Sequence, residues 1–207
     1  ADQPNGGGLL KLQAVNPTSS AGSRHIPTGI FANQQANFGF YDVGGDLSGT
    51  FSSGENKGAI NVTTFEHSSG LIFKNIAQFR QISMQEVQDL DGSSAAILHL
   101  DQSNAVDQFS EEFQVQGDPS KRLQWVAGVF YFTEEGYVDT RTAVFGRLPN
   151  IRIGAAENTS FSVFGQADFD VTPTLSVTGG GRYTWDERSI DQQLRNPAGD
   201  CIFCEVF

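Results

Sequence analysis

Polar and apolar residues alternate along most of the chain from residue 58 onward. This period of two is typical of β-strands with two different faces, and the spacing of amphipathic helices is hard to find. Six such runs cover 58–67, 71–83, 106–116, 123–136, 159–170 and 175–186. The pattern predicts an all-β, antiparallel fold whose strands have roughly 10–14 residues, against the ~5–6 usual in soluble domains.

The stretches between these runs alternate in length. Short turns are predicted at 68–70, 117–122 and 171–174, and long connections at 84–105, 137–158 and 187–207. Short turns at one end of a sheet and long loops at the other are the layout of outer-membrane β-barrels. We therefore expect 58–187 to be a six-stranded, up-and-down segment of a transmembrane β-barrel. Residues 1–57 are expected to form a Gly/Ser-rich loop region with short strands, and 188–207 the start of an extracellular loop.

The last two runs separate an apolar face from a polar face. Their odd positions are mainly apolar and their even positions mainly polar. In a barrel the apolar face contacts lipid and the polar face lines the lumen. The positions expected to face lipid are Phe161, Val163, Phe169, Val177, Tyr183 and Trp185. The positions expected to face the lumen are Glu112, Gln114, Arg182 and Asp186. The runs 71–83 and 123–136 carry apolar residues on both faces and do not assign cleanly.

A soluble β-sandwich is the alternative, because its strands also alternate, with the apolar face turned to a second sheet. The chain would then be a secreted glycan-binding or adhesion module. Alternation alone does not separate the two folds. Strand length and the sorting of connections by end favour the barrel.

The amino-acid composition limits the classes of partner and of membrane segment that the chain can have. The chain has 13 Lys and Arg against 24 Asp and Glu, a net charge of −11, which argues against a nucleic-acid partner. Mean hydropathy is −0.28, and no apolar run approaches the ~20 residues of a spanning helix. The first residues show neither the basic nor the apolar region of a signal peptide. Seventeen Phe exclude an acidic disordered tail.

No catalytic, cofactor or metal site is predicted. The three His are scattered, and His99 is placed in a loop near Asp101. Asp89 to Gly92 begins like a calcium loop but lacks the closing glutamate. We expect these side chains to be solvated.

Several segments resemble the barrel of TonB-dependent outer-membrane receptors. DQFSEEFQV (107–115) followed by LQWVAGVFYF (123–132) is similar to that family's "QFSQE-L-L … W-x-x-G-x-Y-Y" hairpin. FSVFGQA (161–167) followed by LSVTGGGRYT (175–184) resembles "A-x-F-G-Q … L-x-L-x-x-G-x-R-Y", and LIFKNIAQFR (71–80) resembles "L-x-L-K-S-I-T-x-Y-R". Each motif alone is weak, but their combination and order over 58–187 are specific.

The resemblance implies a 22-stranded barrel closed by an N-terminal plug. It implies uptake of ferric siderophores, vitamins or glycans across the outer membrane of a Gram-negative bacterium, energised through TonB and without enzymatic activity. The expected partners are outer-membrane lipid, a small nutrient such as a ferric siderophore, and TonB through a plug. No plug, TonB box or terminal strand is found in the sequence, and six strands cannot close even an eight-stranded barrel. We therefore expect a portion of a receptor.

Two features of the predicted loops remain open. Cys201 and Cys204 form a local disulfide that stiffens a loop, or they are free or metal-bound thiols. Arg141, Arg147 and Arg152 attract an anionic ligand such as a ferric chelate, or they contact lipopolysaccharide and neighbouring acidic loops.

Overall fold

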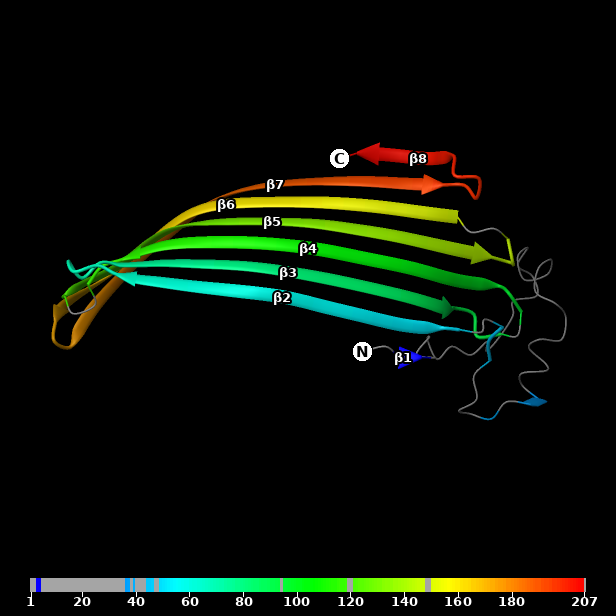
Figure 1. Ribbon diagram of the computed structural model, residues 1–207, viewed down its shortest axis with the longest axis horizontal. Helices are drawn as coiled ribbons and strands as arrows, with labels where there is room; N and C mark the ends of the chain where they lie inside the picture. Colours follow the sequence, from blue (N-terminus) through cyan, green and yellow to red (C-terminus); the bar gives the residue numbers. More distant parts are fainter. Residues whose placement is uncertain are drawn as a thin grey trace.

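The computed structural model describes residues 3–4, 36–37, 39, 44–46, 49–93, 95–118, 121–147 and 150–206. They form one eight-stranded antiparallel sheet in which each strand pairs with the next in the sequence (Figure 1). The strands are β1 (Gln3–Pro4), β2 (Phe51–Glu66), β3 (Ile72–Asp89), β4 (Leu98–Gln116), β5 (Leu123–Val144), β6 (Asn150–Thr172), β7 (Leu175–Arg195) and β8 (Cys201–Val206). The two ends of the chain lie at opposite edges of the sheet, which is open (Figure 1). The all-β, antiparallel, up-and-down arrangement is confirmed, and the described residues hold no second sheet of a sandwich.

The six long strands, β2 to β7, have 16 to 23 residues and exceed the predicted lengths. The connections expected to be long are correspondingly short, at 90–97, 145–149 and 196–200. The sequence underestimates β5, for example, because its loop-end half carries polar residues on both faces around Asp139 and Arg141, so the period of two disappears there. Residues 188–207, expected as the start of a loop, hold the end of β7 and all of β8.

The register is continuous across the sheet. Irregularities occur between Asp170 and Thr172 and between Leu194 and Arg195, both at strand ends. From β2 to β7, odd-numbered residues pair with odd-numbered residues, as in the row Tyr131, Phe161, Trp185, except for the pair Thr172–Leu175 beyond the irregularity in β6. One side of the sheet is therefore an odd face and the other an even face.

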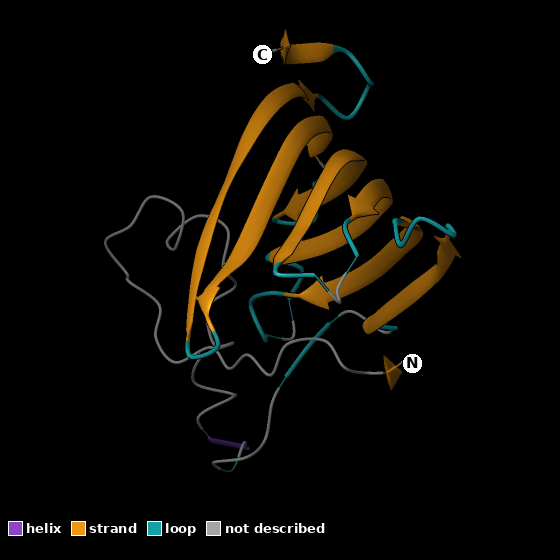
Figure 2. Cartoon of the chain, turned by 90° about the vertical axis from the view of Figure 1, so that its left-hand side faces the viewer, coloured by secondary structure: helices purple, strands orange, loops and turns teal. Residues whose placement is uncertain are grey.

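The described part of the chain has no buried hydrophobic side chain. A sheet needs a partner layer on each apolar face, and here the strands form one curved layer (Figure 2). No helix among the described residues is long and apolar enough to cross a membrane. The function of the sheet therefore depends on whether each of its two faces contacts lipid, water or another protein layer.

The turns at one end are tied together. Gly70 has a φ of 84°, which suits glycine, and its N–H donates to the carbonyl of His67. The Arg122 guanidinium, in the turn between β4 and β5, donates to the carbonyls of Asp170 and Val171 at 2.7 to 3.1 Å. We call this the turn end of the sheet and the opposite end the loop end.

Candidate functional site: two faces and a loop end

The turn half of the odd face is apolar and exposed. It carries all six residues expected to face lipid, among them Tyr183 and Trp185 with 61% and 51% of their surface exposed. Neighbouring strands add Phe79, Phe109, Phe113, Leu123, Val129 and Tyr131. We call this surface the apolar band.

The register aligns both borders of the band. In β5 it runs from Leu123 to Tyr131, and these two residues pair with Phe169 and Phe161 of β6. Phe169 and Phe161 pair in turn with Val177 and Trp185 of β7. Between these paired residues each of the three strands spans nine residues, or about 26 Å at a rise of ~3.3 Å per residue. Val171 and Leu175 continue the exposed apolar surface toward the turns. A tilted strand needs ~9–11 residues to cross the hydrocarbon of a membrane.

Aromatic rings gather at the borders of the band. At its loop-side border the Phe161 and Trp185 rings stack with centroids 5.7 Å apart, and Tyr183 meets Trp185 edge-on at 4.5 Å. Near the turn end the centroid of the Phe73 ring lies 6.3 Å from that of Phe65 and 6.4 Å from that of Phe113. Aromatic girdles at the two interfaces are typical of membrane barrels.

Immediately beyond the loop-side border the odd face turns acidic. Asp107, Glu135 and Glu157 lie in one register row across β4, β5 and β6. Gln81 of β3 donates to the Asp107 carboxylate at 2.9 Å. Across β5 and β6 the change from rings to carboxylates takes two rows, whereas in β4 Glu111 already lies in the border row, opposite Tyr131.

The even face is polar and internally hydrogen-bonded. It carries the four residues expected to face the lumen, Glu112, Gln114, Arg182 and Asp186. Gln114 donates to the Glu112 carboxylate, and Gln116 donates to Gln114 at 2.8 Å. Asn158 and Gln108 both donate to the carboxylate of Glu134. Residues on this face of β5 and β6 are more covered than their odd neighbours, and Ser162 is fully buried.

A few rings on the even face explain why the run 123–136 resists assignment from sequence. Phe130 lies under the Arg182 guanidinium, 5.2 Å from ring centroid to Cζ. Phe164 faces Gly128 across the β5–β6 pair, and a Cβ on Gly128 would lie 2.6 Å from the Phe164 Cζ. These rings therefore cover neighbouring strands rather than forming an apolar surface.

The structure does not gather the three loop-end arginines on one face. Arg141 lies on the odd face of β5 and donates to the Asp139 carboxylate at 3.2 and 3.3 Å. This hydrogen bond, with the negative charge of Asp139, raises the pKa of Arg141 above its ordinary value. Arg152 lies on the even face of β6 opposite Thr140, and Arg147 is exposed in the connection between the strands.

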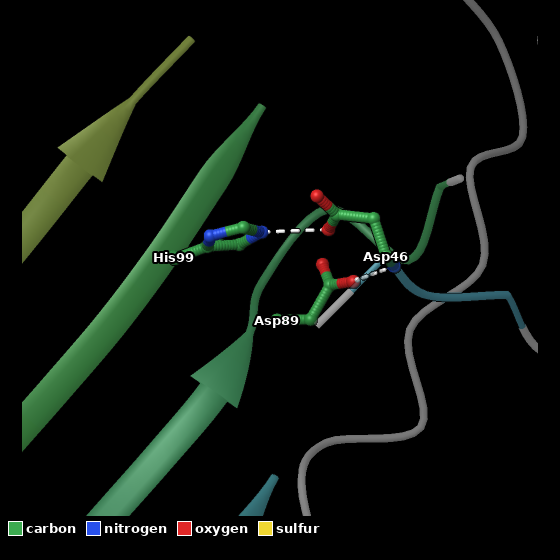
Figure 3. Close-up of side chains that lie close together, drawn as sticks. All are labelled: Asp46, Asp89 and His99. Atoms are coloured by element: carbon green, nitrogen blue, oxygen red, sulfur yellow. Dashed lines mark hydrogen bonds and ion pairs between the residues drawn. The ribbon is translucent and has the colours of Figure 1, made fainter. Parts of the chain in front are cut away.

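A cluster of Asp46, Asp89 and His99 lies at the loop end of the β3–β4 hairpin (Figure 3). Its ligand atoms lie within 4.8 Å of one another. Asp89 and His99 are a register pair, and the His99 ring lies 2.6 Å from the Asp46 carboxylate. Sequence reasoning expected His99 in a loop beside Asp101 and missed the cluster, because Asp46 precedes His99 by 53 residues. The sequence signal that could have indicated this cluster is the absence of cationic side chains around it, since no Lys or Arg occurs between Arg80 and Lys121.

The structure bonds Cys201 to Cys204. Both lie in β8 rather than in a loop, and Cys204 pairs with Gln193 of β7. The bond therefore closes within a strand at the edge of the sheet.

Long antiparallel strands with a register-aligned apolar band on one face and a polar opposite face define a wall segment of a transmembrane β-barrel. The family model of the TonB dependent receptor-like β-barrel matches residues 3–200. The chain belongs to this family, as its motifs indicate, and the family is one of receptors and transporters rather than enzymes.

A similar solved structure is the ferric yersiniabactin uptake receptor FyuA from Yersinia pestis. It aligns with a TM-score of 0.64 and 13% sequence identity, over 77% of this chain and 24% of that receptor. The likeness shows the same fold, and the chain spans about a quarter of the length of that receptor. Among curated protein sequences none matches this chain.

Proposed function

We propose that the chain is part of the barrel wall of an outer-membrane receptor of a Gram-negative bacterium that takes up a ferric siderophore or a similarly scarce nutrient. The observation that carries the proposal is the apolar band, whose two borders stay in register across β5, β6 and β7. In this arrangement the odd face contacts lipid and the even face lines a wet lumen.

Charge supports this orientation over its reverse. Arg182 lies on the even face of β7, next to the middle of the stretch from Val177 to Trp185. Turned to lipid, an arginine at the bilayer midplane costs about 2–4 kcal/mol. Glu112 and Lys74 on the same face would add to this cost, whereas in a lumen all three remain hydrated.

The partners of the proposed receptor follow from its two faces and from the family. Outer-membrane lipid covers the apolar band. Energy from TonB would reach the receptor through a plug and not through the strands described here. The FyuA likeness supports an iron chelate as the nutrient, because that protein is a ferric yersiniabactin uptake receptor.

The sequence left two roles open for the loop-end arginines, attraction of an anionic ligand and contact with lipopolysaccharide, and we assign different arginines to the two roles. Arg152 lies on the even face and suits an anionic ligand entering the lumen, since guanidinium matches carboxylate and phosphate geometry. Arg141 lies on the odd face beside Asp139 and suits the lipopolysaccharide side. We assign ligand attraction to Arg152 and to the exposed Arg147.

An uptake assay in the bacterium that produces the protein tests the proposal. Deleting its gene should abolish accumulation of iron-55 supplied as ferric yersiniabactin or as another chelate in a panel of ferric siderophores. Restoring the gene should restore uptake only when TonB is present. Unchanged uptake of every chelate in the deletion strain would exclude a role in iron acquisition.

A further inference from the structure

The Asp46, Asp89 and His99 cluster joins the ends of two strands to a segment that precedes β2. Asp46 N–H donates to the Asp89 carboxylate at 3.1 Å, and the Asp46 carboxylate lies 2.6 Å from His99 Nε2 (Figure 3). We propose that these three side chains bind a divalent transition-metal cation of the zinc class, which fastens residues 44–46 to the β3–β4 hairpin. The proposal does not depend on transport.

The spacing of the donors suits such an ion. Zinc binds imidazole nitrogen and carboxylate oxygen at about 2.0–2.2 Å in tetrahedral sites, which separates ligand atoms by about 3.3 Å. The three candidate ligand atoms already lie within 4.8 Å of one another. His99 Nε2 and Asp46 Oδ1 need to move apart by less than about 1 Å. Water would complete the coordination.

Backbone groups already orient the Asp89 carboxylate. Its Oδ1 accepts hydrogen bonds from the N–H groups of Asp91 and Gly92, both at 3.1 Å. Only 6% of Asp89 is exposed. In metal sites, hydrogen-bond donors behind a ligating carboxylate fix its orientation. Gly45 allows the close approach, because a Cβ there would lie 3.0 Å from Asp89 Oδ2.

The cluster lacks compensating positive charge. It combines two carboxylates with one imidazole, and His99 is the only ion-pair partner found for these carboxylates in the described part of the chain. Residues 81–120 contain no Lys or Arg. A divalent cation would offset the cost of holding a buried carboxylate beside a second one.

The donor set selects the class of metal. Calcium and magnesium take oxygen ligands, six or more for calcium, whereas imidazole favours zinc and neighbouring transition metals. The competing interpretation is a metal-free ion pair between His99 and Asp46. The metal site predicts that each chain binds one ion and that binding requires His99, whereas the ion pair predicts no bound metal.

Calorimetric titration of the detergent-purified protein with Zn²⁺ tests the proposal, with the Cys201–Cys204 bond left oxidised. We expect one ion per chain, and Co²⁺ should give the visible absorption of a four-coordinate site. His99→Asn and Asp89→Asn should each weaken Zn²⁺ binding at least about tenfold, in line with the sensitivity of metal sites to their ligands and supports.

Two matched variants control for charge and for another histidine. Asp101→Asn removes a carboxylate two residues from His99 on the same strand face, and His67→Asn removes a histidine at the turn end. Both should bind Zn²⁺ like the unsubstituted protein, and circular dichroism should show the same strand content in all variants. A protein that binds no Zn²⁺, or that binds it equally after His99→Asn, overturns the proposal.

Discussion

The rings of Phe161 and Trp185 stack across the β6–β7 pair, 5.7 Å between centroids, at the loop-side border of the apolar band. Two rows further on, Glu157 occupies the same face. The proposed border between lipid and water therefore depends on a few neighbouring positions. Position-specific measurements can locate it.

Trp185 fluorescence reports whether this border meets lipid. In a Trp125→Phe background Trp185 is the only tryptophan, and lipids brominated at a shallow acyl position should quench its emission strongly in reconstituted vesicles. The physical reason is contact between the ring and the acyl chains at an aromatic girdle. Weak quenching by brominated lipid together with strong quenching by aqueous iodide would place the odd face in water.

Arg122 should stabilise the turn end. Its guanidinium donates to the carbonyls of Asp170 and Val171, and hydrogen bonds from charged donors exceed ordinary ones. Because the side chain is exposed, we expect Arg122→Ala to lower the free energy of unfolding by only about 1 kcal/mol. Urea unfolding in vesicles measures this loss, with Lys121→Ala as the neighbouring control. An equal effect of both variants would show that the Arg122 bonds contribute nothing specific.

Gly128 should not tolerate a side chain. A Cβ there would lie 2.6 Å both from the Phe113 carbonyl oxygen and from the Phe164 ring, whereas a Cβ on Gly179 would meet nothing within 4 Å. Overpacking of this kind costs about 1–3 kcal/mol. The melting temperature measured in detergent should therefore fall markedly for Gly128→Ala and little for Gly179→Ala. Similar melting temperatures for the two variants would mean that the strands separate to admit the methyl group.

Charge reversal distinguishes the two arginines placed on opposite faces. Arg152→Glu should lower initial iron-chelate uptake several-fold, because it puts a negative charge on the proposed ligand path. Arg141→Glu should leave uptake nearly unchanged, since Arg141 is already paired with Asp139. Uptake with equal numbers of receptors on the cell surface is the measurement. Equal sensitivity to both substitutions would contradict the assignment of Arg152 to the lumen.

Much of the fold could be predicted from alternation alone. In the turn halves of β6 and β7 the odd positions are mainly apolar in the sequence, and the structure places them together on one face. The loop-end halves of the strands could not be predicted in the same way. Around Asp139 and Arg141, for example, the chain is polar on both faces, although main-chain hydrogen bonds extend β5 to Val144.

The candidate sites also include some features that the sequence predicts and others that only the structure shows. Cys201 and Cys204 are close in sequence, so their pairing was one of a few open alternatives, and the structure joins them. The arginines were grouped because they lie within one stretch of chain, but the two faces of the sheet separate Arg141 from Arg152. Asp46 and His99 lie far apart in sequence, and no local pattern connects them.

The sequence by itself determined the strand type, the apolar and polar faces and the membership of a receptor family, because each depends on residues one or two positions apart or on contiguous motifs. The tertiary structure decided the register that aligns the borders of the apolar band and the approach of Asp46 to Asp89 and His99. Those depend on contacts between segments distant in the chain, which hydrogen bonding between strands and the path of residues 44–46 bring together.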